Sequence, residues 1–270
     1  QKKYEFFMNP EMKGHFMLNS WFYSAGPRNA HPQGTVSYVP LQLHQFSRKR
    51  MGYRKPNVFF GAVSPMDKHG YFSLSLCTVL EKDFVENADI VIMEVNPNLP
   101  RTFGDTHVHI SEIDYLVEVD AEVPTLEQPV LTEKDLLIGN YAADLVEDGS
   151  TIQIGFGSIT GAIAQCLSNK KDLGLHSEMF TDSVLNLYEA GAITNRKKTL
   201  WKDKFVTDAA LGSRKLYDFL DENMAVEFHR SSVVNDPAII ARNNKMVSIN
   251  AALQMDLTGQ CCAESIGMQL

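Results

Sequence analysis

The sequence predicts an α/β fold built around parallel sheets, and two observations carry this prediction. Short, purely apolar runs bounded by turn residues recur along the chain, and stretches with helical periodicity separate them. Runs of this length and purity are typical of strands buried on both faces of a parallel sheet. Alternation of strand and helix is the pattern of α/β layers.

In the first half, four apolar runs are predicted strands and two intervening stretches are predicted helices. The strands are residues 36–41, 57–63, 88–95 and 115–119, and the helices are residues 43–50 and 79–87.

The second half opens with a helix that Thr132 caps, with Asp135 completing a pair that resembles a capping box. We expect Gly149 to end this helix, and its apolar face to comprise Leu136, Leu137, Tyr141, Leu145 and Val146. The predicted elements that follow are a strand at 151–154, a helix at 158–168, a strand at 205–211, helices at 214–222 and 237–243, a strand at 246–253 and a turn at 256–259.

Residues 123–130 (VPTLEQPV) hold two prolines and lack periodicity, which makes them the best linker candidate. We therefore predict a first domain at 1–124, a linker at 125–131 and a second domain at 132–270. The chain starts at Gln1 and stops in the apolar run 265–270, from which we expect it to be part of a longer polypeptide.

Composition limits the classes of function. The 270 residues are 44% hydrophobic and 21% charged, enough for a substantial core. A net charge of −8 argues against a nucleic-acid partner, and no apolar run approaches the ~18–20 residues that span a membrane. The first residues show no charged-then-apolar pattern that would predict secretion, and Cys77, Cys166, Cys261 and Cys262 lack a disulfide or metal spacing. We expect reduced, buried cysteines and a cytoplasmic location.

A glycine-rich turn, Gly155-Phe156-Gly157-Ser158, joins a predicted strand to a predicted helix. Such a turn leaves the first N–H groups of the helix unpaired, so it can hold a phosphate, a carboxylate or a developing oxyanion. The third glycine of a dinucleotide fingerprint is missing, which argues against a nicotinamide site. A plain turn without a ligand remains an equal alternative.

Glu178 interrupts the apolar run 175–180, at the carboxyl end of a predicted strand. A carboxylate in uncharged surroundings beside free N–H groups is a candidate nucleophile next to an oxyanion site. The alternative, favoured for an isolated acid, is a solvated side chain at a strand end. Its place at the carboxyl end of a strand favours a functional role, because ligands of open α/β sheets bind there.

Other polar patterns are weaker. His107 and His109 lie on one face of a strand, but no further ligands complete a metal site, so we predict none. The basic run Arg196–Lys198 is interpreted as a solvated face, although it could meet a phosphate.

Segments along nearly the whole chain resemble the acetyl-CoA hydrolase/transferase family, which includes 4-hydroxybutyrate and butyryl-CoA:acetate CoA-transferases. The segments that carry the resemblance are 64–72, 94–105, 109–115, 153–159, 174–182 (GLHSEMFTD), 189–195, 247–250 and 259–267. The family implies two similar open α/β domains of the CoA-transferase type with the active site between them. Both would be incomplete here, because relatives start earlier and run past residue 270.

By this resemblance Glu178 is the nucleophile. It would attack the acyl-CoA thioester to give a mixed anhydride and then a glutamyl-CoA thioester, with ping-pong kinetics. Backbone N–H groups around Gly155, Gly157 and Ser158 would hold anionic oxygens, and Asn250 would donate a hydrogen bond near the thioester carbonyl.

The resemblance also implies the partners. Coenzyme A thioester is a substrate rather than a permanently bound cofactor, a carboxylate such as acetate is the second substrate, and the family favours homodimers. The alternatives are an acyl-CoA hydrolase that uses the same glutamate and a non-catalytic CoA-binding fragment. One departure is Thr160, where relatives carry a proline that would stiffen the first helical turn.

Overall fold

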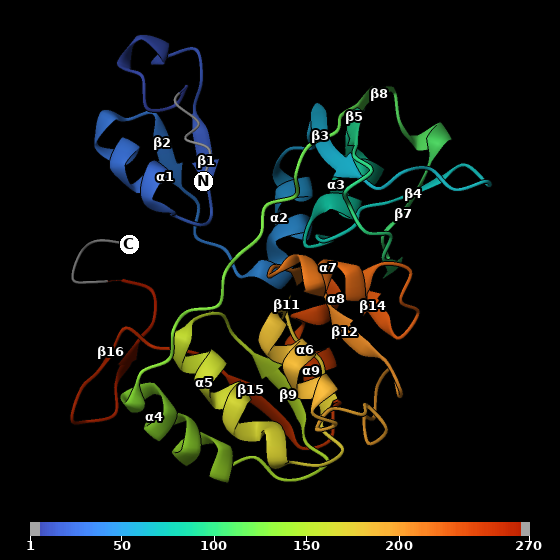
Figure 1. The fold of residues 1–270 in the computed structure, drawn as a ribbon. Helices are drawn as coiled ribbons and strands as arrows, with labels where there is room; N and C mark the ends of the chain where they lie inside the picture. Colours follow the sequence, from blue (N-terminus) through green and yellow to red (C-terminus); the bar gives the residue numbers. More distant parts are fainter. Residues whose placement is uncertain (1–5, 266–270) are drawn as a thin grey trace. The chain divides into compact units, whose positions relative to one another are not determined.

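The computed structural model describes residues 6–265, which fall into two compact units (Figure 1). The larger unit is Leu43–Ala251, and the smaller unit combines the described parts of 1–42 and 252–270. All four cysteines lie in the described part of the chain and are free. The prediction that they are buried is wrong, because Cys261 is exposed and the other three are only partly buried. Within residues 6–265, no helix has both the length and the apolar character that crossing a membrane requires.

The smaller unit contains two short pairs of strands. β1 (Leu18–Ser20) and β2 (Val36–Tyr38) are parallel and are joined through α1 (Ala25–Ala30). Phe7, Ala30 and Val36 form a small core there. The other pair, β16 (Gln254–Met255) and β17 (Cys261–Cys262), is antiparallel, and the Gly259 N–H donates to the Asp256 carbonyl in the predicted turn.

The first sheet of the larger unit is parallel, as predicted. It consists of β3 (Val58–Val63), β5 (Ile90–Val95) and β8 (Tyr115–Glu118). Helices α2 (Phe46–Tyr53) and α3 (Glu81–Asn87) and an antiparallel pair, β4 (Tyr71–Ser73) and β7 (His107–His109), accompany it.

One face of this first sheet is open, so the prediction that its strands are buried on both faces is wrong. The packed face carries Val63, Val91 and Met93. On the other face Phe60 is 72% exposed and Tyr115 is 61% exposed. The apolar purity of the runs gave no sign of this difference between the faces.

The second sheet is parallel and lies in the main core. Its first strands are β10 (Gly174–Leu175), β9 (Thr151–Ile154) and β15 (Met246–Ile249), in that order. The sheet continues on the β10 side, where His176 directly after β10 forms a bridge with Val206 of β12 (Phe205–Thr207). β12 pairs with β14 (Val226–Phe228), and β14 pairs with β6 (Phe103–Gly104). β6 comes from the first half of the chain. The strands β9, β10 and β12 are largely buried on both faces, as predicted for this half.

Two strands of this sheet bend. After β10 the chain turns at Glu178 and continues as β11 (Met179–Phe180). After β12 it turns at Asp208 and continues as β13 (Ala209–Ala210), which pairs with β11 in parallel. The single strand predicted at 205–211 is therefore two short strands.

Helices cover this sheet (Figure 1). They are α4 (Glu133–Asp144), α5 (Ser158–Cys166), α6 (Asp182–Glu189), α7 (Arg214–Leu220), α8 (Ser231–Val234) and α9 (Pro237–Ile240). Single 3-10 turns lie at Pro10–Met12, His31–Gln33, Leu43–Gln45, Ile110–Glu112 and Leu167–Asn169.

Helix α4 confirms one prediction and corrects two. The capping box forms, because the Asp135 N–H donates to Thr132 Oγ1 at 3.2 Å and the Thr132 N–H donates to Asp135 Oδ2 at 2.9 Å. The helix ends at Asp144 rather than at Gly149. Leu137, Tyr141 and Leu145 of the predicted apolar face are exposed.

The buried residues of α4 are Gly139 and Ala143. A Cβ atom on Gly139 would lie 2.9 Å from the Ala162 carbonyl oxygen of α5. Two helices can approach this closely only through small side chains, so periodicity of large apolar residues indicated a face of which only Val146 is buried and Leu136 partly buried.

The segment 119–132 has no regular secondary structure. It lies against α7 and the loop that precedes this helix, because the Leu126 N–H donates to the Gly212 carbonyl at 2.9 Å and the Tyr217 hydroxyl donates to the Pro124 carbonyl at 2.7 Å. The domain boundaries at 124 and 132 stay a prediction.

Candidate active site

The sequence-predicted site residues lie at the carboxyl ends of three neighbouring parallel strands. β9 ends at Ile154 directly before Gly155, β15 ends at Ile249 directly before Asn250, and β10 leads into Glu178. The order β10-β9-β15 brings these three ends to one edge of the sheet. This edge is where open α/β sheets bind ligands.

The glycine turn combines one N–H group that is used by the sheet with others that are available. The Gly155 N–H donates to the Ile249 carbonyl at 2.8 Å. Gly157 is the N-cap of α5 with φ of 131°, a backbone conformation that favours glycine, and among residues 6–265 no side-chain cap accepts from the first turn of the helix. The N–H groups that begin at Ser158 can therefore meet an anion.

Asn250 packs directly over this turn. A Cβ atom on Gly155 would lie 2.6 Å from Asn250 Oδ1, so only glycine leaves room for this side chain. Gln153 orients the amide, because its Nε2 donates to Asn250 Oδ1 at 3.1 Å and its Oε1 accepts from Asn250 Nδ2 at 2.9 Å. Gln153 was not predicted as a site residue from the sequence, although its position one residue before the end of β9 places it next to the glycine turn.

Thr160 closes the first turn of α5 from the inside. Its side chain is buried, and Oγ1 donates to the Gly157 carbonyl at 3.0 Å. This bond holds the turn that a proline at position 160 would stiffen through its ring.

Glu178 is fixed by its backbone at the bend between β10 and β11. Its carbonyl accepts from Thr207 Oγ1 at 2.9 Å, from the Ala209 N–H at 3.0 Å and from the Asp208 N–H at 3.2 Å. The side chain is partly buried, and burial raises the pKa of its carboxyl group. A carboxylate that is poorly hydrated is the kind of group that can act as a nucleophile.

A second acid, Asp208, stands at the matching bend of the neighbouring strand. It is fully buried, and burial together with the charges of Glu178 and Glu81 raises its pKa to about 8. Sequence reasoning missed it, although Asp208 interrupts the apolar run 205–211 in the same way that Glu178 interrupts 175–180.

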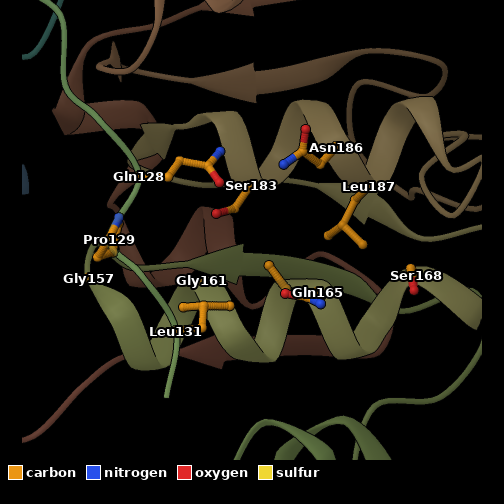
Figure 2. A pocket seen from close by; sticks show the side chains of 11 residues that line it. Gln128, Pro129, Leu131, Gly157, Gly161, Gln165, Ser168, Ser183, Asn186 and Leu187 are labelled. Atoms are coloured by element: carbon orange, nitrogen blue, oxygen red, sulfur yellow. The ribbon is translucent and has the colours of Figure 1, made fainter. Parts of the chain in front are cut away.

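A cavity of about 200 Å³ lies between α5 and α6, beneath the extended segment that precedes α4 (Figure 2). Uncharged polar groups line much of it, namely Gln128, Gln165, Ser168, Ser183 and Asn186. A smaller hollow of about 40 Å³ shares Gly157 and Gly161 with it and reaches Gly155 and Asp182. The two hollows adjoin the glycine turn, and Glu178 lines neither of them.

The basic run 196–198 is a solvated face only in part. Lys198 is buried, and its Nζ donates to the carbonyls of Leu175 at 2.6 Å and Lys204 at 2.7 Å. Burial lowers the pKa of this lysine to about 7. The prediction that Lys198 belongs to the solvated face is wrong, because the side chain reaches under the strand that carries Glu178.

The two histidines of the H-x-H pattern take part in local contacts. His109 Nδ1 lies 2.7 Å from Ser111 Oγ, and His107 Nδ1 lies 3.4 Å from the Gly104 carbonyl. Within the described range 6–265, no group of three or more histidine, cysteine, aspartate or glutamate side chains is arranged to hold a metal.

Two family models match the sequence. Residues 3–127 match the N-terminal domain of acetyl-CoA hydrolase/transferase, and residues 212–270 match the C-terminal domain of the same family.

Individual relatives agree with these models. The chain is 41% identical over 253 residues to succinyl-CoA:cyclohexane-1-carboxylate CoA transferase from Geobacter metallireducens, covering 94% of this chain and 58% of that protein. It is 42% identical over 262 residues to 4-hydroxybutyrate coenzyme A transferase from Clostridium kluyveri, covering 96% of this chain and 60% of that protein.

Among solved structures, RipA from Yersinia pestis superposes with a TM-score of 0.91 at 34% identity, covering 96% of this chain and 62% of that one. The chain therefore spans about three fifths of the length of the proteins it matches.

Proposed function

The chain belongs to the acetyl-CoA hydrolase/transferase family, and on this premise we propose that it carries the nucleophile of a CoA-transferase, Glu178. The reaction would move coenzyme A from a short-chain acyl-CoA to a free carboxylate.

The observation that carries this proposal is the position of Glu178. The carboxyl group is partly buried at a bend in the sheet, with its backbone held by three hydrogen bonds. It shares the carboxyl edge of the strands with the open N-terminus of α5 and with Asn250. A surface acid would need none of these features.

In the proposed reaction, a Glu178 carboxylate oxygen attacks the thioester carbonyl and the C–S bond breaks, which gives a mixed anhydride and CoA thiolate. The thiolate then attacks the glutamyl carbonyl, which forms the glutamyl-CoA thioester and releases the first carboxylate. An incoming carboxylate attacks this thioester and regenerates an anhydride and CoA thiolate. Attack of the thiolate on the new acyl carbonyl gives the new acyl-CoA and frees Glu178.

Each attack places negative charge on a carbonyl oxygen. N–H groups at the start of α5, from Gly157 and Ser158 onward, are suited to stabilise this charge. Asn250 places its acceptor atom Oδ1 beside Gly155, and its Nδ2 donates to Gln153 Oε1 at 2.9 Å and to Ser248 Oγ at 3.0 Å, so donation to the same region would require the amide to turn over. Gln153 would keep that amide oriented through the two hydrogen bonds between their side chains.

The proposed donors are butyryl-CoA or 4-hydroxybutyryl-CoA and the proposed acceptor is acetate. The relative from Clostridium kluyveri bears the name 4-hydroxybutyrate coenzyme A transferase, and other relatives are named for butyrate, acetyl-CoA or acetate. Coenzyme A would enter and leave as a substrate.

The covalent intermediate provides the test. The full-length gene product is exposed to butyryl-CoA without acetate, and its intact mass is measured with and without borohydride. We expect a CoA adduct in the unaltered protein and in Glu189→Gln, whose exposed carboxylate pairs with Lys215, but not in Glu178→Gln. An adduct that persists in Glu178→Gln would refute the assignment. CoA release at the same rate with and without acetate would favour the hydrolase instead.

A further inference from the structure

Glu178 and Asp208 form a pair of acids at equivalent positions of adjacent parallel strands. His176 bridges Val206 before the two bends, and Met179 pairs with Ala209 after them, so Glu178 stands opposite Asp208. The Asp208 N–H donates to the Glu178 carbonyl at 3.2 Å, which ties the two bends together.

The surroundings of Asp208 suit a neutral acid better than a carboxylate. Its side chain is fully buried. Oδ2 accepts hydrogen bonds from the Ser231 hydroxyl and, at 3.0 Å, from Asn235 Nδ2. Oδ1 is buried and has no hydrogen-bond partner among residues 6–265. An ionised oxygen buried without a donor is costly, whereas a proton on Oδ1 removes that charge.

Among residues 6–265, the charged side chains that act most strongly on Asp208 are acidic, and His229, which follows β14 at the matching position, pairs its Nε2 with Glu227 Oε2 at 3.0 Å. Glu178 comes from the neighbouring strand, and Glu81 comes from the first turn of α3. Cys77, on the loop before α3, is close enough for Asp208 to influence it, and burial raises the pKa of its thiol. The groups that contact the Asp208 side chain from α8 and its C-cap are the neutral side chains of Ser231 and Asn235. This arrangement favours a proton on Asp208 while Glu178 is ionised.

We propose that Asp208 is a positioning residue that stays protonated beside Glu178, so that the pair carries one negative charge instead of two during acyl and CoA transfer. The inference rests on the proposed role of Glu178. With Asp208 neutral, the thiolate and the carboxylates that approach Glu178 meet a single anion. Once Asp208 ionises, a second buried charge opposes each negatively charged transition state.

The pH dependence of glutamyl-CoA formation in the full-length gene product tests this role. We expect the rate to fall about tenfold per pH unit above about pH 8, where Asp208 loses its proton. Asp208→Asn mimics the neutral acid, so it should keep the rate at about pH 7 within about threefold and lose the alkaline decline. Asp208→Ala removes the acceptor of Ser231 and Asn235 and should be slower at every pH.

A second variant shifts the decline without removing the acid. The Ser231 hydroxyl stabilises the ionised form of Asp208 and lowers its pKa. Ser231→Ala should therefore move the alkaline decline to higher pH. Two results would overturn the proposal. One is that Asp208→Asn forms glutamyl-CoA as slowly as Asp208→Ala does. The other is that the alkaline decline in rate is unchanged in both Asp208→Asn and Ser231→Ala.

Infrared spectroscopy separates this inference from the proposed function. The difference spectrum between about pH 6 and about pH 10 should contain the carbonyl band of a protonated carboxylic acid that disappears in Asp208→Asn. This band does not depend on turnover. If the band is present but Glu178→Gln still forms the CoA adduct, the nucleophile assignment fails while the protonated acid stands. If the band is absent, the proton on Asp208 is refuted.

Discussion

Arg230 holds three carboxylates that lie far from it in the sequence, and its replacement by methionine is expected to destabilise the larger unit strongly. Nη1 donates to Asp83 Oδ1 at 2.7 Å, Nη2 donates to Glu86 Oε1 at 2.6 Å, and Nε donates to Asp105. Arg230 directly precedes α8, so its ion pairs join this helix to α3 and to the segment after β6.

Burial determines the size of the expected effect. The side chains of Arg230, Asp83 and Asp105 are 21%, 15% and 25% exposed, whereas Glu86 is 37% exposed. Removal of one partner of a fully buried ion pair costs about 3–5 kcal/mol, and partial hydration of this cluster lowers the expected loss to about 2–4 kcal/mol.

Urea unfolding of the full-length gene product at about pH 7 measures this loss, and Arg214→Met is the matched control. Arg214 pairs with Asp218 at 2.8 Å, but the two side chains are 59% and 62% exposed, so the control should lose only about 0.3–0.5 kcal/mol. A loss for Arg230→Met no larger than that of the control would refute the reasoning from burial.

Two further predictions concern the site. In Gly155→Ala the new Cβ would lie 2.6 Å from Asn250 Oδ1, so the variant should displace the Asn250 amide and slow glutamyl-CoA formation about 100-fold. The control is Gly61→Ala, whose Cβ would lie 2.8 Å from Met93 Sδ. This control should lower stability without changing the rate of glutamyl-CoA formation per folded molecule. Equal rates for the two variants would argue against a role for Asn250. The second prediction is a pH dependence of stability: Asp208 has a pKa of about 8 when folded against 3.8 when unfolded, so its stabilising contribution is complete below about pH 3.8 and is lost as the pH rises to about 8. The free energy of unfolding of Asp208→Asn relative to the unaltered protein should therefore rise across this pH range, by at most about 6 kcal/mol. Urea titrations at several pH values measure this difference between the two proteins. A difference that does not change with pH would show that Asp208 is ionised throughout the range.

Patterns that act over a few residues predicted the fold well. The parallel sheets, the capping box of Thr132 and Asp135, and the turn at 256–259 follow from local propensity and hydrogen bonding, and each is present. Patterns that depend on distant partners failed. The exposed face of the first sheet and the exposed Leu137 and Tyr141 of α4 have the same local sequence signature as buried residues, because burial depends on which element packs against them.

The sequence by itself determined that the chain has an α/β fold, that a glycine turn precedes a helix, and that Glu178 interrupts an apolar strand. Only the tertiary structure decided that Gly155, Glu178 and Asn250 share one edge of a sheet, that Gln153 orients the amide of Asn250, and that Lys198 is buried. The pairing of Glu178 with Asp208 also belongs to the tertiary structure, because the two acids lie far apart in the chain and only the register of adjacent strands brings them together. Local sequence encodes the conformation of each strand, whereas the charge state of a buried acid depends on which other acids the fold places beside it.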